Sequence, residues 1–100
     1  MIIVIARVEA DPARMDELQH ALDAMMRATW EESGCISYSM AVENKDMGIV
    51  SVVERWESVE ALKSHFDEPH MASFNAAVKD AVRSIDARMY EVVNETPLTF

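Results

Sequence analysis

The feature that most constrains the fold is the first segment, residues 2 to 9, which reads Ile-Ile-Val-Ile-Ala-Arg-Val-Glu. β-Branched residues of this kind favour a strand. Its first half is apolar at both odd and even positions, and successive side chains of a strand point to opposite faces. We therefore expect a strand that is covered on both faces.

A long amphipathic helix is predicted next. Asp11 and Pro12 suit its start, because Asp caps a helix and Pro fits the first turn, and Gly34 suits its end. Between them apolar residues recur at spacings of three and four, as one buried helix face requires: Met15, Leu18, Leu22, Met25, Met26 and Trp30.

Residues 35 to 57 predict a β-hairpin. Residues 35 to 43 alternate and residues 49 to 57 return, with a turn at residues 43 to 48 between them. The alternation places four larger side chains of the first strand on one face: Ile36, Tyr38, Met40 and Val42.

Ser58 is expected to cap a short helix that Pro69 interrupts. A further helix is predicted to carry Met71, Phe74, Val78, Val82 and Ile85, followed by a last strand at residues 87 to 93. The order β-α-β-β-α-β is the split βαβ, ferredoxin-like pattern of the α+β class. We predict one domain, residues 1–100, with a four-stranded antiparallel sheet.

Helices on one face of such a sheet leave the other face open. The strands are apolar there as well, as Ile3 and Ile5 show beside Ile2 and Val4. An exposed apolar face marks an interaction surface, and a chain of this size buries only somewhat over about 60% of its unfolded surface. We expect a homodimer with sheet packed against sheet.

The charge argues against some partners. Nine basic and eighteen acidic residues give a net charge of −9, and Lys and Arg form no cluster. We therefore expect no nucleic acid and no membrane as a partner. Cys35 is the one cysteine, which leaves no partner for an internal disulfide, and we expect a cytoplasmic protein.

Several motifs connect these elements to a known family: Glu31-Glu32-Ser33-Gly34-Cys35-Ile36-Ser37-Tyr38, Glu54-Arg55-Trp56-Glu57-Ser58, Ala61-Leu62-Lys63-Ser64-His65 and Pro69-His70. In order and spacing they resemble the antibiotic-biosynthesis monooxygenase family, one of the dimeric α+β-barrel proteins. The resemblance extends from Ile2 to Val93. It implies a homodimer with a pocket in each subunit between the helices and the concave sheet.

Members of that family include oxygenases that use no metal or flavin and act on quinols or anthrones, whereas others degrade haem or process a phosphorylated sugar. The positions that match the Asn, Trp and His of the haem-degrading branch are Arg7, His65 and Asn75, which disfavours haem. Trp56 matches the Trp of the anthrone-oxidising branch, but Val52 and Leu62 replace its Asn and Tyr. This difference argues against the same chemistry here.

A cofactor-free oxygenation needs a base, a dry apolar pocket and a donor for developing negative charge. We predict His65 and His70 as catalytic candidates, with His65 the stronger because it lies at the edge of an apolar stripe. His70 begins a helix, which keeps an imidazole neutral. Their structural alternatives are a helix-end hydrogen bond for His65 and a cap or surface position for His70. His20 is expected in solvent.

The expected substrate-binding residues are Trp56, Phe66, Phe74, Tyr38 and Arg7. Trp56 can stack on an aromatic ring, although the aromatic residues also suit a core and Arg7 can pair with Glu54 or across the dimer. His65 and His70 do not have the spacing that puts two metal ligands on one helix face, and no nucleotide fingerprint is present. We predict no metal and no cofactor.

The leading function is a cofactor-independent monooxygenase that oxidises a small aromatic hydroxyl compound of the quinol type. A non-oxidative isomerase on the same scaffold, or a non-catalytic binding or accessory dimer, is the alternative. Oxygen uptake with hydroquinones would separate the first from the others, and proton exchange without oxygen uptake would favour the second.

Overall fold

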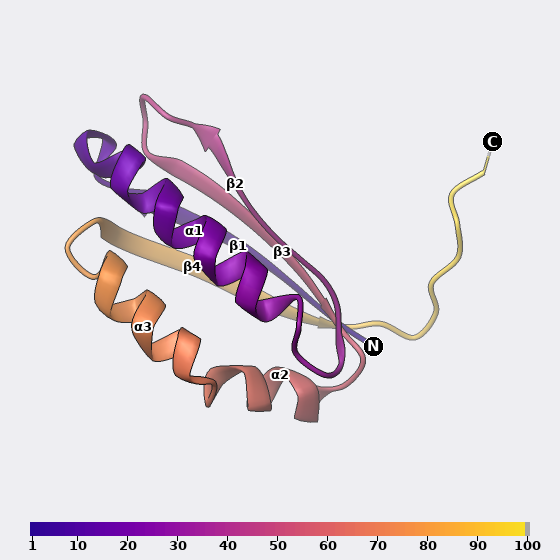
Figure 1. The fold of residues 1–100 in the computed structure, drawn as a ribbon. Helices are drawn as coiled ribbons and strands as arrows, with labels where there is room; N and C mark the ends of the chain where they lie inside the picture. Colours follow the sequence, from indigo (N-terminus) through magenta and orange to yellow (C-terminus); the bar gives the residue numbers. More distant parts are fainter. Residues whose placement is uncertain (100) are drawn as a thin grey trace.

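One antiparallel sheet carries the three α-helices on a single face (Figure 1). The structure is a computed structural model that describes residues 1–99. Four strands pair in the order β2-β3-β1-β4, which confirms the ferredoxin-like α+β prediction. The elements are β1 (Ile2–Ala10), a 3₁₀ turn η1 (Pro12–Arg14), α1 (Met15–Thr29), β2 (Cys35–Asn44), β3 (Ile49–Trp56), α2 (Val59–Phe66), α3 (Pro69–Val78) and β4 (Val82–Glu91).

Local signals set where the helical segments begin. Asp11 Oδ1 accepts a hydrogen bond from Ala13 N at 3.0 Å, before η1 leads into α1. Ser58 Oγ accepts from Ala61 N at 3.1 Å at the start of α2. Pro69 occupies the first turn of α3, where its missing N–H costs no hydrogen bond. Side-chain caps of this kind stabilise a helix by typically ~1 kcal/mol.

The helix-covered face of the sheet buries two clusters of side chains. The first, the Leu18 cluster, joins α1 to the middle of the sheet: Ala6, Ala10, Met15, Leu18, Leu22, Val50, Val52 and Val78. The second, the Trp56 cluster, lies where α2 meets the sheet: Ile2, Val4, Met25, Tyr38, Trp56 and Leu62. The candidate site adjoins the second cluster.

Gly34 holds the loop between α1 and β2 close to α2. Its φ of +84° is unfavourable for residues with a side chain. A Cβ at this position would lie 2.6 Å from the Cβ of Ala61, and Glu57 N donates to Gly34 O at 2.9 Å. A glycine is therefore needed where the loop that carries Glu32 approaches α2.

The prediction that the last helix continues through Val82 and Ile85 was wrong, because α3 ends at Val78 and both residues lie on β4. Val82 pairs with Ala10 and Ile85 pairs with Val8, with a register shift between the two pairs. This irregularity puts two residues that are three apart on the same side of the sheet. The spacing therefore resembles that of a helix face.

Two further expectations need correction. Ile36 does not share a face with Tyr38, Met40 and Val42, because a register shift between Cys35 and Ser37 leaves it 42% exposed. The first helix ends at Thr29 rather than reaching Gly34. Trp30 is consequently half-exposed, although its Nε1 donates to Tyr38 O at 2.7 Å.

The sheet face opposite the helices, called the outer face, carries exposed Ile5, Val53 and Tyr90. Residues 92–99, after β4, leave the fold as an extended tail (Figure 1), and Glu95 of this tail pairs with Arg55. Among residues 1–99, no helix has the length and apolar character needed to cross a membrane.

Candidate active site

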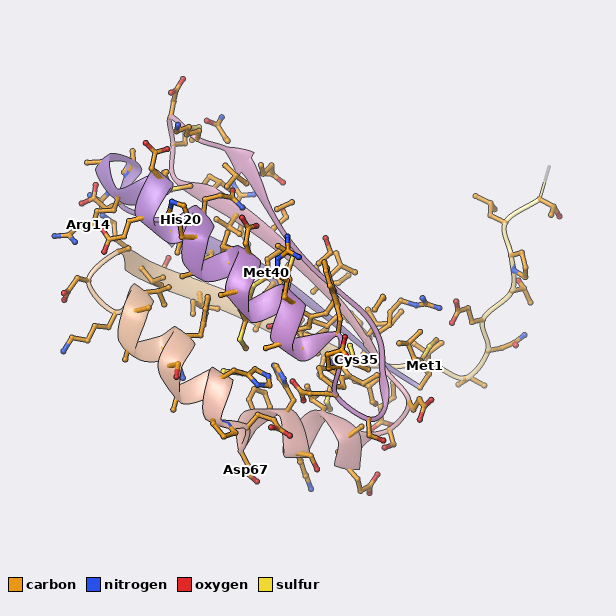
Figure 2. The ribbon with its side chains drawn as sticks, in the orientation of Figure 1. Met1, Arg14, His20, Cys35, Met40 and Asp67 are labelled. Carbon is orange, nitrogen blue, oxygen red and sulfur yellow. The ribbon has the colours of Figure 1, made fainter. Side chains whose placement is uncertain are left out.

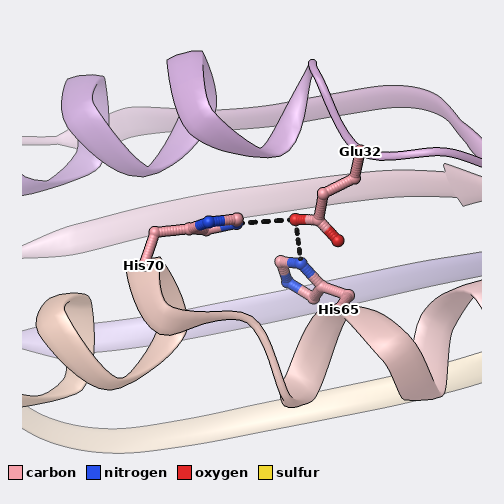
Figure 3. Close-up of side chains that lie close together, drawn as sticks. All are labelled: Glu32, His65 and His70. Atoms are coloured by element: carbon pink, nitrogen blue, oxygen red, sulfur yellow. Dashed lines mark hydrogen bonds and ion pairs between the residues drawn. The ribbon is translucent and has the colours of Figure 1, made fainter.

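Three side chains from separate elements converge on one point, as Figure 3 shows. Glu32 Oε2 lies 2.7 Å from Nδ1 of His65 and 2.6 Å from Nε2 of His70. The side chain of Glu32 is 7% exposed, that of His65 1% and that of His70 23%. A nearly buried carboxylate therefore joins two histidines.

The break between α2 and α3 explains how both histidines reach the same oxygen. His65 lies in the last turn of α2, and His70 is the second residue of α3. Asp67 N donates to Ser64 O at 3.1 Å and Glu68 N donates to His65 O at 3.2 Å, which tightens the end of α2. Because Pro69 then starts a new helix, the two rings are not fixed on one helix face.

The contacts with Glu32 determine which ring nitrogens carry hydrogen. An ionised carboxylate only accepts hydrogen bonds, so Nδ1–H of His65 and Nε2–H of His70 must both donate to Glu32. In the neutral rings the lone pairs are then on Nε2 of His65 and Nδ1 of His70. Glu32 thus holds each histidine in a defined tautomer.

His65 is packed among aromatic rings. Its ring centroid is 4.8 Å from that of Trp56 and 5.3 Å from that of Tyr38. The helix-phase argument correctly indicated that His65 faces inward, but at 1% exposure its ring has no open surface for a substrate to contact. The geometry favours His70 over His65 as the histidine that meets a substrate.

A cleft of about 230 Å³ opens between α1 and α3 beside His70. Small side chains make room for it, since Ala21 and Ala24 come from α1 and Ala77 from α3. Met25 and Phe74 also line the cleft, and Ser73 is its other polar lining residue. A small apolar molecule in this cleft would therefore contact His70 at the cleft wall.

Buried ionisable groups continue beyond Glu32 into the Trp56 cluster. Trp56 Nε1 donates to Glu54 Oε1 at 2.9 Å, and burial raises the pKa of Glu54. Burial and the neighbouring carboxyl groups of Glu54 and Glu32 raise the pKa of Tyr38 far above its ordinary value. A neutral Tyr38 hydroxyl is therefore strongly favoured over the phenolate.

The structure brings some of the expected binding residues together and separates others. Phe74 lines the cleft, whereas Trp56 and Tyr38 are buried behind His65. Phe66 is 60% exposed and is absent from the cleft lining. Arg7 lies on the outer face, where its Nη1 donates to Glu43 Oε2 at 3.0 Å. Of the two pairings considered for Arg7, the one with Glu54 is wrong, because β1 and β3 turn these side chains to opposite faces of the sheet.

Sequence reasoning missed Glu32, the residue that links the two histidines. Glu31 and Glu32 are adjacent in the same motif, and no local signal separates the exposed one from the buried one. The prediction of no metal also considered only the spacing of the histidines. In the structure Glu32, His65 and His70 each offer one donor atom, and these atoms lie within 4.8 Å of one another.

Comparison with known proteins gives consistent similarities. The family described as "Antibiotic biosynthesis monooxygenase" matches residues 1–77. "Putative monooxygenase Rv0793" of Mycobacterium tuberculosis is 38% identical over 77 residues, which cover 77% of this chain and 75% of the relative. Its solved structure superposes with a TM-score of 0.84 at 32% identity, covering 96% of this chain and 98% of the other.

"Probable quinol monooxygenase YgiN" of Escherichia coli is 26% identical over 102 residues, covering 91% of this chain and 97% of the relative. A solved structure from Deinococcus radiodurans has a TM-score of 0.88 at 22% identity, and each chain is covered in full, at 100%. At 22% identity, the similarity to the Deinococcus radiodurans structure concerns the fold alone.

Proposed function

The chain belongs to the antibiotic biosynthesis monooxygenase family, and on that basis we propose that it oxidises a small aromatic hydroxyl compound of the quinol type without a cofactor. Relatives named as monooxygenases, one of them as a quinol monooxygenase, support this reaction class. The observation that carries the proposal is the Glu32–His70 contact at the wall of an apolar cleft.

His70 is the proposed general base. With Nε2–H held by Glu32, its Nδ1 accepts the proton of a phenolic hydroxyl bound in the cleft. Glu32 then stabilises the imidazolium through a short charge-assisted hydrogen bond, as the carboxylate of a Ser-His-Asp triad does. His65 fixes Glu32 from the buried side at 2.7 Å and is therefore a positioning residue.

The substrate can supply every electron that the reaction needs. Conversion of a hydroquinone to a hydroxyquinone places one atom of O₂ on the ring, releases the other as water and takes four electrons from the substrate. No external reductant is required, and this balance supports a cofactor-free reaction. An apolar cleft favours the reaction of the deprotonated substrate with O₂, because it excludes water.

The size of the cleft restricts the substrate. At about 230 Å³ it is smaller than the pockets of about 300–1,000 Å³ that enclose drug-sized ligands. We therefore propose a substrate of one or two fused rings. Phe74 and Met25 provide the apolar contacts for its faces.

We also propose that the protein is a homodimer formed through the outer face. Ile5, Val53 and Tyr90 are exposed there around a hollow of about 420 Å³ lined also by Arg7 and Arg88. An apolar surface with a charged surround is typical of an interaction site. Light scattering should give twice the chain mass of 11.3 kDa, and a monomer at micromolar concentration would refute the dimer.

Oxygen uptake with a panel of one- and two-ring hydroquinones tests the proposed reaction. His70→Ala should lower the rate by about 10²–10⁴-fold, the usual effect of losing a positioned base. His20→Ala is the matched control, because His20 is exposed on α1, far from Asp67 at the α2–α3 junction (Figure 2). Equal rates for the two variants would exclude His70 as the base, and proton exchange into a carbonyl compound without oxygen uptake would favour an isomerase.

A further inference from the structure

We propose that Glu32, His65 and His70 form a binding site for a divalent transition-metal ion of the Zn²⁺ type. The site is the point where the two rings and the carboxylate converge (Figure 3). This inference goes beyond the proposed function and does not depend on it, because it concerns binding of the ion alone.

The donor set fits such an ion. Two imidazole nitrogens and one carboxylate oxygen are the protein ligands of several zinc sites that keep a position open, whereas Mg²⁺ and Ca²⁺ prefer oxygen ligands. Oε2 of Glu32 already lies 2.7 and 2.6 Å from the nitrogens of His65 and His70. Zinc–nitrogen distances of about 2.0–2.1 Å require the nitrogens to be no more than about 4.2 Å apart.

The described geometry needs only a small adjustment to meet that limit. The three donor atoms lie within 4.8 Å of one another, and His70, with 23% of its side chain exposed, is the least enclosed of the ligands. His65 and Glu32 are fixed by burial. Closure of His70 onto an ion held by the other two ligands completes the site.

The charges around the site favour entry of a cation. On its solvent side Glu32 lines a polar cleft of about 300 Å³, which is also lined by Glu57, Glu60 and Glu68. No basic residue lines this cleft, and the whole chain carries a net charge of −9. Carboxylates gathered along one approach raise the local concentration of cations.

Binding requires a change of tautomer rather than a change of charge at the histidines. An ion coordinates the unprotonated nitrogen of an imidazole. Nδ1 of His65 and Nε2 of His70 would therefore each lose the hydrogen that they donate to Glu32, and the other nitrogen of each ring would gain one. The ion replaces both hydrogen bonds and neutralises the buried carboxylate.

The ion and the proposed reaction exclude each other. With a metal at Nε2, the hydrogen of a neutral His70 is on Nδ1, the atom that would accept the substrate proton. This consequence rests on the proposed function. The experiment below contains no substrate, so failure of the metal site and failure of the proposed reaction are distinguishable.

Calorimetric titration of the untagged, chelator-treated chain with Zn²⁺ tests the site. We expect one ion per chain with a dissociation constant in the micromolar range or below, and no binding of Mg²⁺ at the same concentrations. Zn²⁺ should also raise the melting temperature, since a ligand of the folded state stabilises it. Glu32→Gln and His70→Ala should each weaken Zn²⁺ binding by more than ~100-fold, beyond the usual effect of residues that only orient a ligand.

Glu31→Gln and His20→Ala are the matched controls, because both residues are exposed and outside the site. Melting of each variant in chelator establishes that it is folded, and Glu32→Gln preserves the side-chain shape if His70→Ala lowers stability. Dissociation constants above about 1 mM, or equal affinities of site variants and controls, would overturn the proposal.

Discussion

The Leu18 cluster contains apolar side chains alone, whereas the Trp56 cluster packs against three ionisable groups. Glu54 accepts a hydrogen bond from Trp56 Nε1 of the second cluster. The His65 ring lies tilted against the same indole and bonds to Glu32. Burying such groups costs free energy unless each is paired. The difference indicates that side chains in the middle of the sheet stabilise the fold. The α2 end instead buries ionisable groups, at a cost in folding free energy, where they can take part in proton transfer.

Leu18→Ala and Leu62→Ala test this comparison with the same substitution in each cluster. Both leucines are buried, at 2% and 6% exposure, so each change should lower the free energy of unfolding by about 2–5 kcal/mol. Only Leu62→Ala should also reduce turnover of the folded protein, because Leu62 lies one turn before His65 on α2. Denaturant unfolding combined with oxygen uptake per folded molecule would measure both effects. Equal turnover of the two folded variants would contradict the difference proposed between the two clusters.

Trp56→Phe should lower the free energy of unfolding by less than the leucine substitutions do, through the loss of one buried hydrogen bond. Removing Nε1 leaves the buried Glu54 without its 2.9 Å donor, which should cost about 1–3 kcal/mol of unfolding free energy. Trp30→Phe is the matched control, because the Nε1–H of Trp30 also donates a hydrogen bond, in its case to the backbone oxygen of Tyr38, but Trp30 is 53% exposed. If both variants melt at the same temperature, the buried Trp56–Glu54 hydrogen bond stabilises the fold no more than the exposed hydrogen bond of Trp30.

Glu54→Gln should give the smallest effect, visible as a pH dependence. Burial raises the pKa of Glu54, while its bond to Trp56 and the nearby His65 lower it and Glu32 raises it. A carboxyl whose folded pKa exceeds its unfolded value stabilises the fold at low pH, and that contribution is lost as pH rises through the folded pKa. The stability of Glu54→Gln relative to the unmodified protein should therefore increase from pH 4 towards neutral pH, and a constant or decreasing difference would contradict this account.

Much of the fold could be predicted because its signals are local. The caps at Asp11 and Ser58 and the hairpin turn between β2 and β3 depend on neighbouring residues alone. The end of α3 at Val78 was not predicted, because Val82 and Ile85 belong to β4, which pairs with β1 through a register shift. Two strands far apart in the sequence produced a helix-like spacing at Val82 and Ile85, which no local pattern could distinguish.

The site was predictable only in part for the same reason. The two histidines were recognisable from the break at Pro69, but their roles depend on Glu32, whose place is set by the contact of Gly34 with Ala61. The burial of His65 likewise arises from Trp56 and Tyr38 on two different strands. Such distances between segments are properties of the assembled fold.

The most direct test of the central claim compares Glu32→Gln with Glu31→Gln in oxygen uptake with a hydroquinone. In the proposed mechanism, the Glu32 carboxylate holds Nε2 of His70 at 2.6 Å and stabilises the imidazolium that forms when His70 accepts the substrate proton, whereas Glu31 is exposed. Loss of the carboxylate should lower the turnover rate by about 10²–10⁴-fold, the range for losing a positioned base; in a Ser-His-Asp triad, loss of the carboxylate partner lowers kcat by about 10⁴-fold. Glu31→Gln should turn over at the unmodified rate. Equal rates for the two folded variants would contradict the account.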